Sequence, residues 1–155
     1  MTNGALKSGE GRAIWVVGDR YTIKAGGEET GGAFALIEAL VPPGGGPPPH
    51  VHRREDEAFY VLEGEVEFHV EGRPIAAGPG AWVTLARGSL HRFQNVGDRP
   101  ARMLIVVTPA GLERFFLEVG RATTNDSASV APSPEEIEKL LAVAPAYGLE
   151  IHAPK

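Results

Sequence analysis

Short apolar segments alternate with turn residues from Arg12 to Val107, and this pattern predicts about eight β-strands. In the clearest segment, Val66, Phe68 and Val70 share one face and polar residues the other, as in a half-buried antiparallel strand. The regular spacing of such short segments favours an all-β sandwich or closed barrel. The expected strands are Ile14–Val17, Tyr21–Lys24, Ala33–Val41, Ala58–Leu62, Val66–Val70, Trp82–Leu85, His91–Val96 and Met103–Val107.

Glycines mark two of the expected connections. Gly64 and Gly72 each lie in a short link between neighbouring strands, and the shortness of these links predicts two hairpins. The chain as a whole contains 20 glycines and 13 prolines, which is high for a helical domain and typical of many short strands joined by turns.

The apolar spacing becomes helical near the C-terminus. Leu112–Val119 predicts a short amphipathic helix, and the small polar residues 122–131 predict a mobile connection. A second helix is expected to begin at Pro134, with Ser133 as its N-cap and Glu136 completing a capping box.

These elements fit one compact unit, because 155 residues are enough for a single core. We expect residues 1–121 to form a β-barrel that includes the N-terminal strands and the first helix. Residues 122–155 are then a connection and a C-terminal helix that packs on the barrel, either over its mouth or on its outer wall.

The composition indicates a cellular location and excludes several kinds of ligand and partner. No cysteine is present, which favours a cytoplasmic protein and limits metal ligands to His, Asp and Glu. The net charge of −5, without a run of Lys or Arg, argues against nucleic acid as a partner. No apolar stretch is long enough for a signal peptide or a membrane span, so no membrane partner is expected.

Four side chains in the central region form a candidate metal site. His50 and His52 are two residues apart, so on an extended segment they point to the same side. Glu57 follows in the next strand, and His91 comes from a distant one. Imidazoles and a carboxylate suit a divalent ion such as Fe, Mn, Co, Ni, Cu or Zn. The preceding Pro42–Pro49 run is interpreted as a rigid entry loop rather than a spacer.

Three consecutive acidic residues, Glu55, Asp56 and Glu57, could each supply the carboxylate ligand. The intervals to His52 and to Gly64 favour Glu57. Strand alternation points Glu57 and Phe59 to the same side, so this carboxylate is a candidate catalytic base as well as a ligand. The charged residues 53–56 are expected to be exposed.

Other residues near the site are expected to have roles other than metal binding. Phe59 and Phe93 are each two residues from a proposed ligand and are predicted to line a substrate pocket. Asn95 is expected at a turn or strand end. His69 and His152 are expected to be solvated residues outside the site.

The spacing of these residues resembles the cupin superfamily. Its first motif is matched by Gly44, His50, His52, Glu57 and Gly64. Its second motif is matched by four residues, although Ala86 stands where the family usually has proline; they are Gly80, Gly88, His91 and Asn95. The resemblance implies a small antiparallel β-barrel or jelly roll, the double-stranded β-helix, with a site of three histidines and one glutamate.

A narrower likeness covers most of the chain. Trp15–Asp19, Pro47–His52, Glu57–Gly64 and Gly111–Phe116 are similar to segments of bacterial single-domain cupins related to quercetin 2,3-dioxygenase. This likeness implies a metal-dependent dioxygenase-like enzyme that acts on a small enol, flavonol or diketone.

Two further functions fit the same residues. One is a non-catalytic cupin that binds a small molecule, and the other is a cupin isomerase or decarboxylase with the same ligands. A metal-free sugar epimerase of cupin shape is disfavoured, because no set of cationic residues for nucleotide phosphates is evident. A homodimer is expected, with the N-terminal strands in contact, since a lone barrel leaves an open sheet edge.

Overall fold

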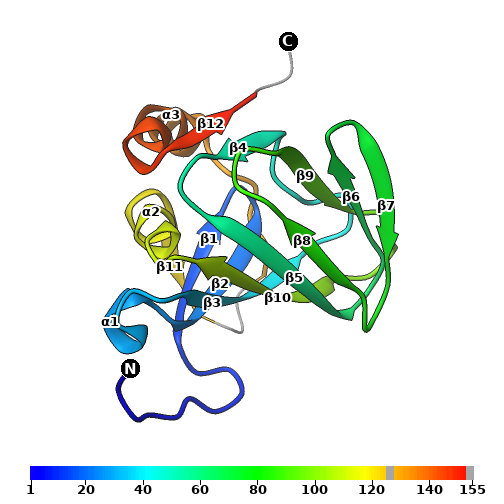
Figure 1. The fold of residues 1–155 in the computed structure, drawn as a ribbon. Coiled ribbons are helices and arrows are strands. Elements are labelled where there is room, and N and C mark those ends of the chain that lie inside the picture. The colour runs from blue at the N-terminus through cyan, green and yellow to red at the C-terminus, as the bar shows by residue number, and fades with distance from the viewer. Residues whose placement is uncertain (125–127, 153–155) are drawn as a thin grey trace.

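Two antiparallel sheets form the body of the molecule (Figure 1), and the computed structural model describes residues 1–124 and 128–152. In spatial order, the larger sheet is β11 (Arg121–Thr123), β1 (Arg12–Val16), β2 (Asp19–Ala25), β3 (Ala35–Val41), β10 (Ala101–Thr108), β5 (Asp56–Glu63) and β8 (Trp82–Leu85). The smaller sheet is β12 (Leu149–Ile151), β4 (His50–His52), β9 (Leu90–Asn95), β6 (Val66–Val70) and β7 (Arg73–Ala77). The predicted all-β jelly roll is confirmed.

Alternation along the strands builds the core between the sheets. Every second residue of β3 and of β10 is buried, beginning with Ala35 and Ala101. From the two sheets, Phe59, Phe68 and Phe93 meet with ring centroids 5.1 to 5.9 Å apart. Aromatic rings at such separations pack edge to face and exclude water from the space between the sheets.

The two glycine connections differ from each other. Gly72, with a φ of 79°, lies in the tight hairpin between β6 and β7, as predicted. The hairpin predicted at Gly64 is wrong, because β5 belongs to the larger sheet and β6 to the smaller one. Gly64 instead lies where the chain crosses between sheets, and a Cβ there would be 2.8 Å from Ala101 Cα. A side chain at this position would collide with Ala101, so close packing requires a glycine here.

Four strands lie outside the segments expected from the pattern, namely β4, β7, β11 and β12, although the hairpin predicted at Gly72 implies β7. Three of them have only three residues, and β7 is exposed at four of its five positions, so none shows a clear alternation. β11 falls partly in the expected mobile connection, where it pairs with β1 instead. Residues 125–127 of that connection lie outside the described residues. Because β1 pairs with both β2 and β11, it is not an open edge.

The helices α2 (Leu112–Val119) and α3 (Pro134–Val143) lie where the sequence predicts them, and α1 (Gly27–Thr30) is one short turn. At α3 the Ser133 hydroxyl accepts from the Glu136 N–H at 3.2 Å, and the Glu136 carboxylate accepts from the Ser133 N–H at 2.6 Å. This is the predicted capping box. None of the helices in the described part of the chain is long and apolar enough to cross a membrane.

The C-terminal segment returns to the ligand-bearing strand. After the 3₁₀ turn η1 (Ala144–Tyr147), β12 pairs with β4, so that Leu149 is opposite His52 and Ile151 is opposite His50. Figure 1 shows α2, α3 and β12 on one side of the molecule. The C-terminal segment therefore extends the smaller sheet beside the strand that carries His50 and His52.

The proline- and glycine-rich loop before β4 is fixed against β9. The Gly44 N–H donates to the Asn95 carbonyl, and the Asn95 N–H donates to the Gly45 carbonyl, both at 2.9 Å. Gly46 has a φ of 136°, and a Cβ at this position would collide with the Phe93 carbonyl oxygen. The loop therefore holds the start of β4 in place, as expected for a rigid entry loop.

We predict that Gly46→Ala lowers the free energy of unfolding by at least about 3 kcal/mol, because both the backbone conformation and the collision oppose it. Gly44→Ala is the matched control, since Gly44 also has a positive φ but its Cβ would meet no atom within 4 Å. It should cost about 1 kcal/mol. Chemical denaturation of both variants measures this, and equal losses would contradict the close-approach argument.

Candidate metal centre

Four predicted ligands converge from three strands. β4 supplies His50 and His52, β5 supplies Glu57, and β9 supplies His91, which is directly opposite His50 in the register. One ligand atom from each residue lies within 4.8 Å of all the others. Ligand atoms about 2.0–2.2 Å from a first-row ion are about 3 to 4 Å apart, so small side-chain movements would complete the coordination. No other such group occurs among the residues that the structure describes.

The backbone orients two of the imidazole rings. His50 Nδ1 lies 2.8 Å from the Pro48 carbonyl oxygen, and His91 Nδ1 lies 3.1 Å from the Ser89 carbonyl oxygen. Each contact suits a ring that donates from Nδ1, so that Nε2 would be the nitrogen that binds a metal ion. Metal-binding histidines in proteins are commonly held in this way.

Glu57 is the electrostatic centre of the cluster. Its Oε2 lies 3.1 Å from His91 Nε2 and 3.3 Å from His52 Nε2, and all three side chains are buried. Burial favours the neutral acid, but the positive charge and hydrogen bonds of His52 and His91 outweigh it and lower the pKa of Glu57. The residue is therefore an anionic carboxylate, which suits a metal ligand.

The pKa values of His50 and His52 are shifted in opposite directions. Burial, together with the charges of His91 and His52, lowers the pKa of His50 to about 3, so this ring is neutral. Burial also lowers the pKa of His52, but Glu57 and Glu55 outweigh burial and raise it to about 9. In the metal-free site a proton on His52 thus neutralises Glu57, and a divalent ion would replace that proton.

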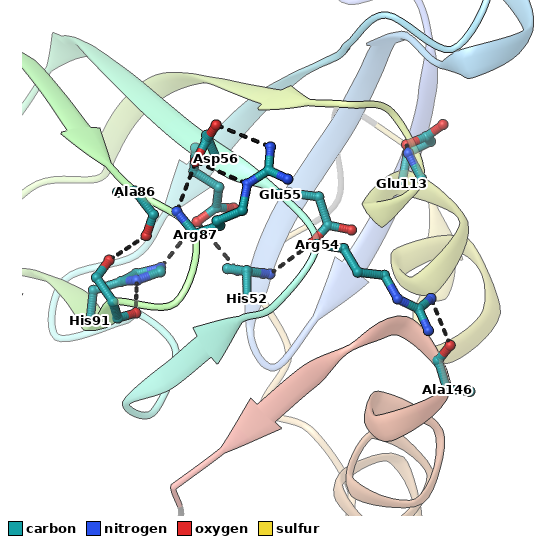
Figure 2. A network of polar contacts seen from close by, with 12 residues as sticks. His52, Arg54, Glu55, Asp56, Ala86, Arg87, His91, Glu113 and Ala146 are labelled. Atoms are coloured by element: carbon teal, nitrogen blue, oxygen red, sulfur yellow. Dashed lines mark hydrogen bonds and ion pairs between the residues drawn. The ribbon is translucent and has the colours of Figure 1, made fainter.

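The expectation that residues 53–56 are all exposed is wrong for Glu55. Glu55 is only 4% exposed, and its Oε2 lies 3.7 Å from His52 Nδ1. Figure 2 shows the Glu55 side chain beside His52. Neither of these two atoms has a hydrogen-bond partner within the described residues. Asp56, in contrast, is paired with Arg87 at the surface, with an oxygen–nitrogen distance of 3.2 Å. The chain turns between β4 and β5, and this turn places Glu55 behind His52.

A largely apolar cavity adjoins the cluster and includes both predicted pocket residues, Phe59 and Phe93. The space open to the centres of water molecules is about 60 Å³. One water needs about 10–15 Å³ by this measure, so the cavity accommodates several waters or a small organic group. Leu140, Leu149 and Ile151 also line it, and therefore α3 and β12 contribute to its wall.

Sequence reasoning missed two polar residues of the cavity, Asp19 and Tyr21. Both are buried in β2, on the larger sheet. Asp19 follows a Val17-Gly18 turn, and an acid beside a turn is usually solvated, so the sequence carried no clear signal of its burial.

The remaining polar residues lie outside the cluster, as predicted, although His69 is less solvated than expected. Asn95 ends β9 as a turn residue, and its side-chain amide donates to the Val41 and Arg99 carbonyls at 3.0 and 2.7 Å. His69 is half-buried outside the cluster and contacts Glu67 at 2.6 Å. His152 is exposed.

Comparisons with known proteins agree with this geometry. Residues 37–107 match the family described as the cupin domain. Quercetin 2,3-dioxygenase of Bacillus subtilis is 25% identical over 149 residues, which are 96% of this chain and 44% of that protein. Polyketide synthase CurC of Streptomyces cyaneus is 36% identical over 73 residues, or 46% of each chain. This chain therefore matches less than half the length of either relative.

A solved structure supports the fold. A crystal structure of a predicted oxalate decarboxylase from Thermotoga maritima has a TM-score of 0.63 and 22% sequence identity, and it aligns with 68% of this chain and 99% of its own. The shared architecture is the cupin jelly roll.

We predict that Glu55→Ala weakens metal affinity by about 10- to 100-fold, because it removes the ion-pair partner 3.7 Å from His52 Nδ1. Asp56→Ala is the matched control, as it removes a neighbouring acid that faces solvent and Arg87. Competition with a chromogenic chelator measures both affinities. If the two variants bind metal as tightly as the parent, Glu55 does not position His52.

Proposed function

We propose that this chain, which contains a cupin domain, is a metal-dependent dioxygenase-like enzyme acting on a small enol, flavonol or diketone. The observation that carries the proposal is the buried cluster of His50, His52, Glu57 and His91 at the wall of an apolar cavity. The names of the two relatives, quercetin 2,3-dioxygenase and polyketide synthase, refer to chemistry of flavonols and of β-dicarbonyl compounds. Both classes contain an acidic enol.

The residues of the cluster have two proposed roles, which are metal binding and proton transfer. The three imidazoles and Glu57 would hold a divalent ion, which when bound supplies Lewis acidity and, if redox-active, chemistry with dioxygen. Both histidine contacts of Glu57 use Oε2, so Oε1 is the atom that would accept the proton of an enol. The lowered pKa of Glu57 makes it a better ligand than base, so proton transfer is the secondary part of its proposed role.

The cavity constrains the substrate. Phe59 and Phe93 offer apolar walls that exclude water from the bound molecule. The space of about 60 Å³ suits a small enol or diketone. A flavonol is much larger, and its entry would require the segment carrying Leu140, Leu149 and Ile151 to move.

The homodimer and the cytoplasmic location expected from the sequence are also part of the proposal. Since β1 is paired on both sides, the dimer contact would use a strand other than β1, such as the sheet edges β8 or β7. Light scattering should give twice the chain mass of 16.4 kDa, and a single-chain mass would reject the dimer.

The activity is tested with metal-loaded protein and a panel of flavonols and 1,3-diketones. We expect dioxygen uptake with at least one redox-active ion and one substrate of the panel. His50→Ala and His91→Ala should retain less than about a tenth of the parental metal and activity, because each removes a ligand. His69→Ala is the matched control and should retain both, since His69 lies outside the cluster.

The outcomes separate the alternatives. Metal uptake without dioxygen consumption for any ion would remove the dioxygenase assignment and leave a decarboxylase, an isomerase or a binding protein that uses the same ligands. Equal metal content in the parent and in the His50 and His91 variants would contradict the metal site itself.

A further inference from the structure

Asp19 is a buried acid that the metal cluster does not use. It begins β2, is 1% exposed and lines the same cavity as His50, His52 and Glu57. Its Oδ2 accepts a long hydrogen bond of 3.4 Å from the Tyr21 hydroxyl. Its Oδ1 is buried without a hydrogen-bond partner, and within the described residues the carboxyl group forms no ion pair. An unsatisfied buried polar atom costs about 1–3 kcal/mol, so its presence requires an explanation.

The surroundings of Asp19 determine its charge. Burial raises the pKa of Asp19 to about 8, although the hydrogen bond from Tyr21 partly opposes this. At neutral pH the side chain is therefore mostly a neutral carboxylic acid. Such a group both donates and accepts hydrogen bonds, and in an apolar site it can bind a carbonyl or hydroxyl oxygen without adding charge.

The backbone around Asp19 holds it in this position. Val17 and Gly18 form the turn between β1 and β2 with φ values of 51° and 86°. A positive φ is unfavourable for a β-branched residue, and Val17 also lines the cavity. On the other side, Gly45 lets the proline-rich loop approach closely, because a Cβ there would lie 3.1 Å from Asp19 Oδ1.

We propose that Asp19, supported by Tyr21, is a second polar anchor of the cavity that hydrogen-bonds an oxygen of the bound small molecule. The anchor comes from β2, whereas the metal ligands come from β4, β5 and β9. The inference rests on the proposed function, in which another oxygen of the same molecule faces the metal cluster. Because both anchors line one cavity, a ligand with two oxygens on an apolar frame would engage both, and 1,3-diketones and hydroxyketones are of this class.

Pentane-2,4-dione is the probe for this anchor, and its binding is measured by calorimetry with both metal-loaded and metal-free protein. Asp19→Leu keeps a side chain of similar size but removes both hydrogen-bonding atoms. We expect it to weaken dione binding by about tenfold in both forms of the protein, as for a hydrogen bond lost in a desolvated site. Azide, which needs only the metal, should bind the loaded variant as it binds the loaded parent.

Conservative variants separate recognition from packing. Asp19→Asn keeps a neutral donor and acceptor in the same place and should stay within about threefold of the parent. Tyr21→Phe removes only the long supporting bond and should weaken dione binding by about twofold to threefold. Circular dichroism and thermal unfolding verify that each variant is folded. If Asp19→Leu does not fold, Asp19→Ala serves in its place.

The results distinguish this inference from the proposed function. Unchanged dione affinity in the folded Asp19→Leu or Asp19→Ala variant, or no dione binding to either form of the parent, would overturn the anchor. Failure of the parent to take up metal would overturn the proposed function alone, because the metal-free titration still decides the role of Asp19.

Discussion

The position of one buried carboxylate sets the constraint on which the structure depends. Glu57 lies between His52 and His91 in a cavity with apolar walls, where an unpaired negative charge would be costly. Without metal, a proton on His52 provides the balancing charge. A divalent ion would provide it more completely, because it neutralises Glu57 and also satisfies the lone pairs of three imidazoles. The register of β4 against β9 and the place of β5 in the opposite sheet hold these groups together.

Much of this arrangement could be predicted from the sequence. The alternation of strands such as β6 gives the all-β class, and the spacing of His50, His52 and Glu57 gives the ligands, because both depend on local geometry. The type of connection at Gly64 could not be predicted in the same way. A short link between strands looks the same whether it closes a hairpin or crosses between sheets, and only the partners of β5 and β6 decide between the two.

Sequence reasoning misplaced Glu55 and missed Asp19 for one shared reason, which is that acidic residues are usually exposed. The local sequence predicts exposure for both residues, because Glu55 lies in a charged run and Asp19 follows a turn. Tertiary packing places one behind His52 and the other in the cavity, and neither position leaves a periodic signal. The short strands β11 and β12 were missed for a related reason, since three residues form a strand only because β1 and β4 are available to pair with them.

The most direct test of the account is anomalous diffraction from crystals of metal-loaded protein, recorded on both sides of the absorption edge of the metal. One strong peak is expected about 2.0–2.2 Å from Nε2 of His50, His52 and His91 and from the Glu57 carboxylate. No peak at this position, or a peak that leaves any of the three imidazoles outside bonding distance, would contradict the account.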